Sequence, residues 1–335
     1  MALQRVSTRE GFLDYMRARK PFLQDGYDRA LSRLLEGVAM EERALVTDAL
    51  RAGKKIRGCL SCLVCEGLGG SLESAIPRAV AIELIQAATL IHDDFIDQDL
   101  TRGGRPAVWT VEGPRRAVLI GDVIFAAALE MMSGLGAKDG LAASRAIAEA
   151  SRGALHEPLD PRMLAEKMAS GELHDRLYEH IIRLKTGILF GAACTLGAIA
   201  ARADEKCLEA CHRYGLSIGE AYQIADDVVE IRTQLSRPLL HPHRMAALAP
   251  ALLRFVPERR THIVALLGGS GSNPGDGAID LFRSAAALME DEIEGRLRSA
   301  GSALLGVSLR RGYDELARRT PRDIVAIFRE SCGPV

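Results

Sequence analysis

The chain has 335 residues, of which 48% are hydrophobic and 26% are charged, and this composition excludes a disordered or fibrous protein. Its 43 Lys and Arg residues almost balance its 44 Asp and Glu residues, which gives a formal net charge of −1. A chain with this balance has no bulk attraction to nucleic acid, so we expect no nucleic-acid partner and only local phosphate recognition.

Three features of the sequence favour a cytoplasmic location. Residues 1–20 scatter charges among apolar residues and lack the continuous apolar core of a secretory signal. The longest uncharged apolar stretch, residues 188–201, is shorter than the ~20 residues that cross a bilayer, which predicts no membrane span. Seven cysteines are an odd number, which argues against a disulfide framework and suits a reducing compartment.

Apolar residues recur at spacings of three and four through most of the chain, as they do in α-helices. Gly and Pro clusters divide this pattern into helix-length segments at residues 69–71, 103–106, 134–136, 158–161 and 268–277. The helical pattern continues on both sides of every break. We therefore predict an all-α fold in which residues 1–335 form a single large helical domain.

A basic segment is the first chemically informative element along the chain. Residues 53–57 read Gly-Lys-Lys-Ile-Arg, and a helical spacing of three would place Lys54 and Arg57 on one face. Cys59, Cys62 and Cys65 follow at the same spacing, which predicts a buried helical stripe rather than a metal site, because a fourth cysteine is missing.

Three carboxylates, Asp93, Asp94 and Asp97, interrupt an otherwise apolar helix at residues 87–97. A spacing of four places Asp93 and Asp97 on one helix face with Asp94 beside them. Like charges this close repel, and burial strengthens the repulsion unless a cation compensates. The natural partner is Mg²⁺, which takes oxygen ligands and commonly bridges carboxylates to substrate phosphates.

A second acid cluster lies downstream, where residues 223–230 read Gln-Ile-Ala-Asp-Asp-Val-Val-Glu. Asp226 shares a helix face with Glu230, and Asp227 is three residues from Glu230. One such cluster alone is equally well explained as a solvated helix face. Two clusters in apolar helices could instead hold several Mg²⁺ ions around one diphosphate and activate it as a leaving group.

Together the motifs of the chain resemble those of the trans-isoprenyl diphosphate synthases, the polyprenyl synthetase family, over nearly its whole length. The matching elements occur in the family's order: Gly53-Lys54-x-x-Arg57, Gln86, Asp93 to Asp97, Arg102 with Gly104-x-Pro106, Gly121-Asp122, Lys185-Thr186 and Tyr222-Gln223-x-x-Asp226-Asp227. The resemblance implies an all-α bundle around a deep apolar cavity, usually in a homodimer.

The resemblance also implies the function and the roles of individual residues. The enzyme would be a prenyltransferase that condenses isopentenyl diphosphate with an allylic diphosphate. Mg²⁺, as several ions per active site, would bind Asp93, Asp97, Asp226, Asp227 and Glu230, with Asp94 in support. The allylic diphosphate would contact Arg102, Lys185, Thr186 and Gln223, and isopentenyl diphosphate would contact Lys54, Arg57 and Gln86.

Product length depends in this family on what lies below the first acid cluster. Ala88 and Thr89 stand about one turn before Asp93, where short-chain members often have a bulky aromatic residue. The small residues resemble those of geranylgeranyl or longer-chain synthases. Phe125 is an alternative residue that would close the cavity further down, and the sequence does not decide between these possibilities.

The chain departs from the family pattern at several positions. Gly103 replaces a second Arg that holds isopentenyl diphosphate, Gly58 replaces a Pro, and the family's Lys-containing loop is shortened, with Arg232 or Arg237 as candidate substitutes. These departures keep two alternatives open. A terpene cyclase of the same fold is disfavoured by the retained isopentenyl residues, and an inactive regulatory subunit by the five retained aspartates.

Overall fold

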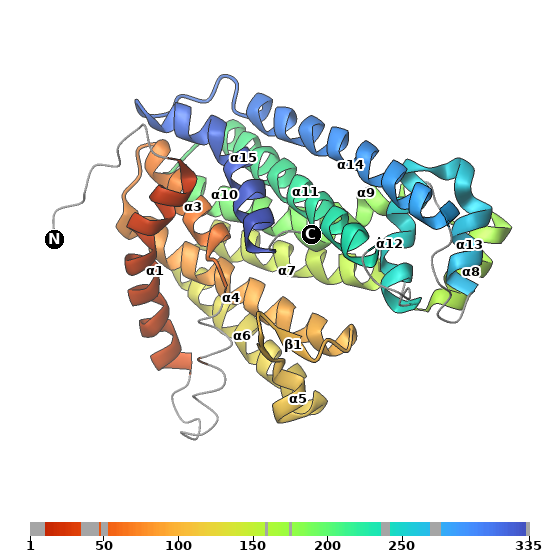
Figure 1. Cartoon of the computed structure of the whole chain (residues 1–335). Helices are drawn as coiled ribbons and strands as arrows, with labels where there is room; N and C mark the ends of the chain where they lie inside the picture. Colours follow the sequence, from red (N-terminus) through yellow and green to blue (C-terminus); the bar gives the residue numbers. More distant parts are fainter. Residues whose placement is uncertain are drawn as a thin grey trace. The chain divides into compact units, whose positions relative to one another are not determined.

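The computed structural model describes residues 11–34, 47, 53–157, 160–173, 176–235, 242–268 and 276–332. These residues are almost entirely helical, which confirms the predicted all-α class (Figure 1). They form two compact units: unit 1 comprises Met1–Ala148, Leu189–Gly215 and Ala303–Thr320, and unit 2 comprises Glu149–Ile188, Leu216–Ser302 and Pro321–Val335. A single domain around a deep cavity therefore stays a prediction.

Unit 1 is organised around one long helix, α4 (Leu72–Ile96), which packs against α1, α3, α5 and α6. The other elements of this unit are α1 (Phe12–Leu34), α3 (Ile56–Gly67), β1 (Thr101–Arg102), β2 (Arg105–Pro106), α5 (Val108–Glu112), α6 (Pro114–Leu135) and most of α7 (Ala137–His156) and α10 (Ile188–Ala200). The Ser71 hydroxyl caps α4 by accepting a hydrogen bond from the Ser74 amide at 3.2 Å. Helix α4 has apolar residues on several sides, and many of them are buried. A helix of this kind packs against neighbours on more than one side.

A two-stranded hairpin follows α4 and was not predicted, because two residues per strand are too few to show an alternating pattern. Thr101 pairs with Pro106, and Arg102 pairs with Arg105. The connecting residues, Gly103 and Gly104, have φ angles of 58° and 77°. Positive φ at both positions defines a type I′ turn, which strongly favours glycine. This geometry is a physical reason for Gly103 where the family has an arginine.

Unit 2 has an aliphatic core. Its elements are α8 (Pro161–Ser170), α9 (Leu177–Ile181), the π-helix η1 (Ile182–Gly187), α12 (Pro242–Phe255), the 3₁₀ turn η2 (Pro257–Arg259), α13 (Arg260–Gly268), nearly all of α14 (Asp276–Ala303) and parts of α11 (Glu205–Leu235) and α15 (Tyr313–Ser331). Helix α12 packs against α8, α9 and α13. Buried Ala, Leu, Ile, Val and Met side chains dominate this core, in keeping with an aromatic content of only 4% in the sequence.

Three helical segments are long and apolar enough to cross a membrane by length and composition, namely Leu72–Ile96, Pro114–Leu135 and Leu177–Ala200. The prediction of no membrane span is therefore not confirmed. The first and third segments are buried over 56% and 83% of their most apolar window, so the protein itself covers them. Helix α6 is different, because only 22% of its window is buried.

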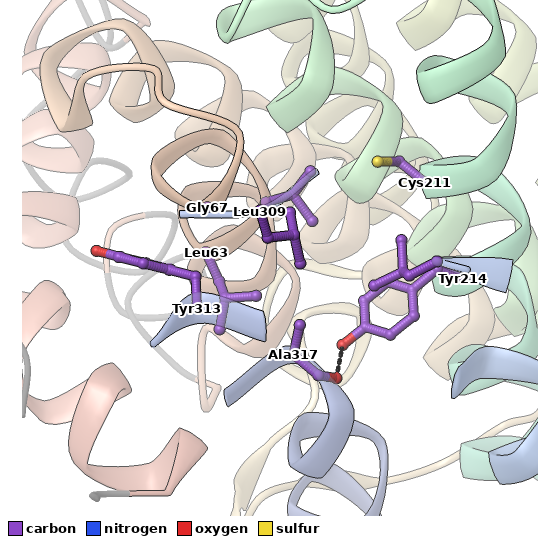
Figure 2. A pocket seen from close by; sticks show the side chains of 9 residues that line it. Leu63, Gly67, Cys211, Tyr214, Leu309, Tyr313 and Ala317 are labelled. Carbon is purple, nitrogen blue, oxygen red and sulfur yellow. Dashed lines mark hydrogen bonds between the residues drawn. The ribbon is translucent and has the colours of Figure 1, made fainter. Parts of the chain in front are cut away.

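A small apolar pocket lies within unit 1 between α3, α11 and the segment that leads into α15 (Figure 2). Leu63, Tyr214 and Leu309 are among its walls. Its free volume is about 10 Å³, which holds at most one water molecule, and its apolar walls would leave that water without hydrogen-bond partners. We interpret the pocket as a packing defect and not as a ligand site.

Candidate active site

The first acid cluster lies at the C-terminal end of α4. The helix ends at Ile96, and Asp97 is its C-cap, with its amide donating to the Asp93 carbonyl at 2.8 Å. Asp94 is buried, Asp93 is half-buried and Asp97 is exposed. The C-terminal end of a helix carries partial negative charge and repels carboxylates. Three acids at this position are therefore unfavourable for folding, and a bound cation would relieve their repulsion.

Arg102, in β1, provides positive charge within this cluster. Its Nε donates to Asp94 Oδ1 at 2.7 Å, and its terminal nitrogen contacts the same oxygen and, at 3.5 Å, Asp99. Burial raises the pKa of Asp94, and the hydrogen bond from Arg102 opposes that effect. The Trp109 indole donates to the Asp99 carbonyl at 2.7 Å and so attaches the loop before the hairpin to α5.

The predicted isopentenyl residues also lie in unit 1, but Lys54 and Arg57 do not share a helical face. Helix α3 begins at Ile56, and Lys55 is left-handed with φ 61°, so Lys54 precedes the helix. The Lys55 ammonium lies 4.2 Å from the centre of the Tyr27 ring, which compensates in part for its burial. Our prediction of a common face was wrong because spacing alone does not reveal this conformation.

Arg57 and Gln86 are both half-buried. The Arg57 guanidinium lies over the Phe190 ring at 4.3 Å from its centre. The side-chain oxygen of Gln86 is buried and has no hydrogen-bond partner among the described residues. The Gly58 amide donates to Glu83 Oε1 at 2.7 Å, a bond that the proline usual at this position could not make. This bond ties the start of α3 to α4.

The candidate chain-length residues occupy neighbouring helices of unit 1. Ala88 is completely buried, and Thr89 is half-buried with its hydroxyl donating to the Gln86 carbonyl at 2.8 Å. Phe125, on α6, packs edge-on against His92 at a ring distance of 5.6 Å. A Cβ at Gly121 would lie 2.1 Å from His92 Nε2, so only glycine permits this approach of α4 to α6. His92 therefore packs between helices.

The second acid cluster, on α11, lies entirely in unit 2. Asp226 is exposed, whereas Asp227 and Glu230 are half-buried. Tyr178, in α9, donates to Asp227 Oδ2 at 2.7 Å, and Gln223 Nε2 donates to Asp227 Oδ1 at 3.0 Å. Burial and the neighbouring Asp226 raise the pKa of Asp227 to about 7, although both hydrogen bonds oppose the rise.

Lys185 and Thr186 lie inside the π-helix η1, directly before α10. Such wide turns are frequent at functional sites. Thr186 Oγ1 donates to Gln223 Oε1 at 2.5 Å, and Lys185 Nζ pairs with Glu157 Oε2 at 2.5 Å. Sequence analysis missed Glu157, the residue that follows α7, because no spacing rule links it to a lysine 28 residues later.

Among the described residues, Glu230 accepts a hydrogen bond from Gln234 Nε2 at 2.5 Å and pairs with the exposed Arg244 at 3.4 Å. Arg232, one candidate for the missing lysine, pairs instead with Glu290 at 2.9 Å. Arg237, the other candidate, lies outside the described residues. Arg244 is thus a basic side chain at the second cluster that sequence analysis missed, because no helical spacing links it to Glu230.

Both acid clusters offer the oxygen ligands that Mg²⁺ prefers. Among the described residues no three His, Cys, Asp or Glu side chains are arranged to hold a metal ion by themselves. Mg²⁺ keeps several waters and is often held by one or two carboxylates together with substrate phosphates. The carboxylates of each cluster therefore fit a Mg²⁺ ion whose remaining ligands come from the substrate and from water. The clusters belong to different units, and their convergence stays a prediction.

The raised pKa of Asp227 predicts how the stability of the metal-free protein depends on pH. Its carboxyl group releases a proton near pH 7 in the folded chain and near its ordinary value of ~4 in the unfolded chain. Between these values the folded state binds more protons, so the free energy of unfolding falls as pH rises. In EDTA, the Tm of Asp227→Asn minus that of the wild type should increase between about pH 5 and pH 8. A constant difference would contradict the assignment.

Comparison with known proteins identifies the family. Residues 42–236, more than half of the chain, match the polyprenyl synthetase family. A geranylgeranyl diphosphate synthase of Mycobacterium tuberculosis is 35% identical over 196 residues, 55% of this chain and 52% of that protein, so the match spans about half of its length. A geranylfarnesyl diphosphate synthase of Aeropyrum pernix is 30% identical over 295 residues, 83% of this chain and 86% of the relative.

A solved structure of similar fold is the polyprenyl synthase of Caulobacter crescentus, complexed with calcium and isoprenyl diphosphate. It aligns with a TM-score of 0.74 at 23% identity and covers 93% of this chain and 97% of that one. At this identity the likeness concerns the fold. The family match and the Aeropyrum relative decide the classification, and the chain belongs to the polyprenyl synthetase family.

Proposed function

We propose that this protein is a Mg²⁺-dependent trans-prenyltransferase that condenses isopentenyl diphosphate head-to-tail with an allylic diphosphate. The observation that carries the proposal is the pair of acid clusters, on α4 and α11, each with its own basic partners. Relatives named as geranylgeranyl, geranylfarnesyl and farnesyl diphosphate synthases support the same reaction class.

The residues of this chain would divide the work between the two substrates. Asp93, Asp97 and Asp226, supported by Asp227 and Glu230, would hold the ions that neutralise the allylic diphosphate as it departs. Bound Mg²⁺ would supply Lewis-acid stabilisation of that leaving group. Arg102 is paired with Asp94, and Lys185 is paired with Glu157. When substrate binds, both basic side chains would exchange these carboxylates for diphosphate oxygens.

The second substrate would bind at the junction of α3 and α4. Lys54 and Arg57 would hold the diphosphate of isopentenyl diphosphate, and Gln86 would hydrogen-bond to it. The double bond would attack the allylic carbon as diphosphate leaves, and a proton would then be lost. Because Gly103 lies in a type I′ turn, this chain would hold isopentenyl diphosphate with one cation fewer than its family.

The test is an assay of purified protein with Mg²⁺, isopentenyl diphosphate and each allylic diphosphate from dimethylallyl to geranylgeranyl, with products sized by chromatography. Elongated prenyl diphosphates are expected. Cyclic hydrocarbons without consumption of isopentenyl diphosphate would favour the cyclase alternative. Absence of turnover with every primer would favour a regulatory subunit.

The small residues before the first acid cluster support a product of geranylgeranyl length or longer. Thr89→Phe tests this assignment, since Thr89 is half-buried and its only described hydrogen bond is within its own helix. If the prenyl tail grows past this position, the variant should stop at a product at least one isoprene unit shorter while turnover persists. An unchanged product would instead indicate that Phe125 closes the cavity, and Phe125→Ala should then lengthen the product.

The exposed apolar surface of α6 supports a homodimer. Leu119 and Val123 are 52% and 53% exposed, and Val111 of α5 is 54% exposed. Exposure of such an apolar surface to water is unfavourable unless another protein surface covers it. The double variant Leu119→Glu/Val123→Glu should therefore convert a particle of twice 36.2 kDa into a monomer, as measured by light scattering. A dimer that survives both charges would contradict this surface. Cytoplasmic residence remains a prediction.

A further inference from the structure

Tyr178 is a buried residue to which no sequence motif assigns a role. It lies in α9, only 4% of its surface is exposed, and its ring packs edge-on against Phe255 at 5.7 Å. Its hydroxyl donates to Asp227 Oδ2 at 2.7 Å, although 49 residues separate the two in sequence. The hydroxyl thus reaches the second acid cluster from another helix.

The other oxygen of Asp227 is held as well. Gln223 Nε2 donates to Asp227 Oδ1 at 3.0 Å, and Gln223 Oε1 accepts a hydrogen bond from Thr186 Oγ1 at 2.5 Å. The carboxylate is therefore restrained from two sides, by α9 and by a chain of bonds that begins in the π-helix. A carboxylate oxygen has two lone pairs, so each oxygen can accept one hydrogen bond and still face a cation.

We propose that Tyr178 is a positioning residue of the second acid cluster, which fixes the orientation of Asp227 toward divalent cation and diphosphate. The inference deepens the proposed function and rests on it. Substitution of a residue that holds a metal-binding side chain in place typically weakens metal affinity about 10- to 100-fold. Loss of the hydroxyl would leave Asp227 with one of its two described hydrogen bonds, the one from Gln223.

Burial of a tyrosine does not by itself explain a carboxylate partner. Tyr214, on the same helix as Asp227, is completely buried, and its hydroxyl donates to the Ala317 carbonyl at 2.7 Å (Figure 2). A backbone carbonyl thus satisfies a buried tyrosine in this protein. Tyr214 provides a matched control, because the bond has the same length and its acceptor is not an acid.

The test compares Tyr178→Phe with Tyr214→Phe in the full chain. Binding of Mn²⁺ in the presence of inorganic pyrophosphate is measured by electron paramagnetic resonance, and Tm is measured in parallel. Tyr178→Phe should weaken Mn²⁺ binding about 10-fold. Tyr178→Phe and Tyr214→Phe should lower Tm by similar amounts. Tyr214→Phe should leave Mn²⁺ binding unchanged. Phe255→Leu, which removes ring packing but keeps the hydroxyl, should change binding less than about 2-fold.

Equal Mn²⁺ affinity in Tyr178→Phe and the wild type would overturn the inference. Equal weakening of Mn²⁺ binding in Tyr178→Phe and Tyr214→Phe would overturn it too. If Tyr178→Phe does not fold, Tyr178→Met carries the same expectation. Asp226→Asn identifies the second cluster as the binding site, and unchanged binding in that variant would also overturn the inference.

The proposed function can fail separately. A wild type that binds Mn²⁺ and pyrophosphate through Tyr178 and Asp226 but forms no prenyl product would refute the prenyltransferase and leave the positioning role intact. In an active enzyme, Tyr178→Phe should raise the Mg²⁺ concentration for half-maximal rate and leave the KM for isopentenyl diphosphate unchanged.

Discussion

Asp93→Ala is expected to lower kcat by at least about 10³-fold, which corresponds to about 4 kcal/mol of transition-state stabilisation. Asp93 lies in the last turn of α4, where the helix dipole already disfavours a negative charge. A bound cation would offset this unfavourable charge, and loss of the carboxylate would then remove a ligand at the point where leaving-group charge develops. Steady-state turnover with saturating Mg²⁺ measures the effect.

The control for this prediction is Cys62→Ala. Cys62 is completely buried, and removal of its sulfur should cost about 1–2 kcal/mol of unfolding free energy without affecting turnover. If the two variants retained comparable activity, the assignment of the first acid cluster to the active site would be wrong.

Arg57→Ala is expected to lower kcat/KM for isopentenyl diphosphate about 10- to 100-fold, with little change in the KM of the allylic substrate. The guanidinium lies against Phe190, which limits its movement, and a charge-assisted hydrogen bond to a diphosphate is worth about 1.5–3 kcal/mol. Because Gly103 supplies no cation, the remaining cations bear more of the binding. Initial rates at varied concentrations of each substrate separate the two effects.

Arg310→Ala is the matched control, since this exposed arginine of unit 1 donates to the Gly69 carbonyl and has no assigned role in substrate binding. It should leave both KM values unchanged. An Arg57→Ala variant that affects both substrates equally would contradict an isopentenyl-specific site, and normal prenyl transfer without Arg57 would exclude the site altogether.

The helical class followed from sequence because apolar spacing of three and four is a local signal that most of the chain carries. The acid clusters were found for a similar reason, since carboxylates among apolar residues conflict with burial. The left-handed Lys55 and the π-helix around Lys185 were not foreseen, because both are backbone conformations that tertiary packing stabilises. Tyr178 escaped notice because its bond to Asp227 joins residues far apart in sequence.

The Gly103 substitution illustrates how structure changes the meaning of a sequence difference. In the sequence it is a lost arginine and raises doubt about condensation. In the structure it is one of two glycines with positive φ in a tight turn that brings Arg102 onto Asp94. The tight turn at Gly103 therefore orients Arg102 toward Asp94. The family has a second arginine where this chain has Gly103.

Calorimetric titration of inorganic pyrophosphate in the presence of Mg²⁺ tests most directly whether the two acid clusters act on one ligand. The wild type is compared with Asp93→Asn, Asp226→Asn and the double variant. A shared ligand predicts one class of site, which either single substitution abolishes, with no further loss in the double variant. If each single variant instead retained binding at the remaining cluster and the two losses were independent, the common site would be refuted.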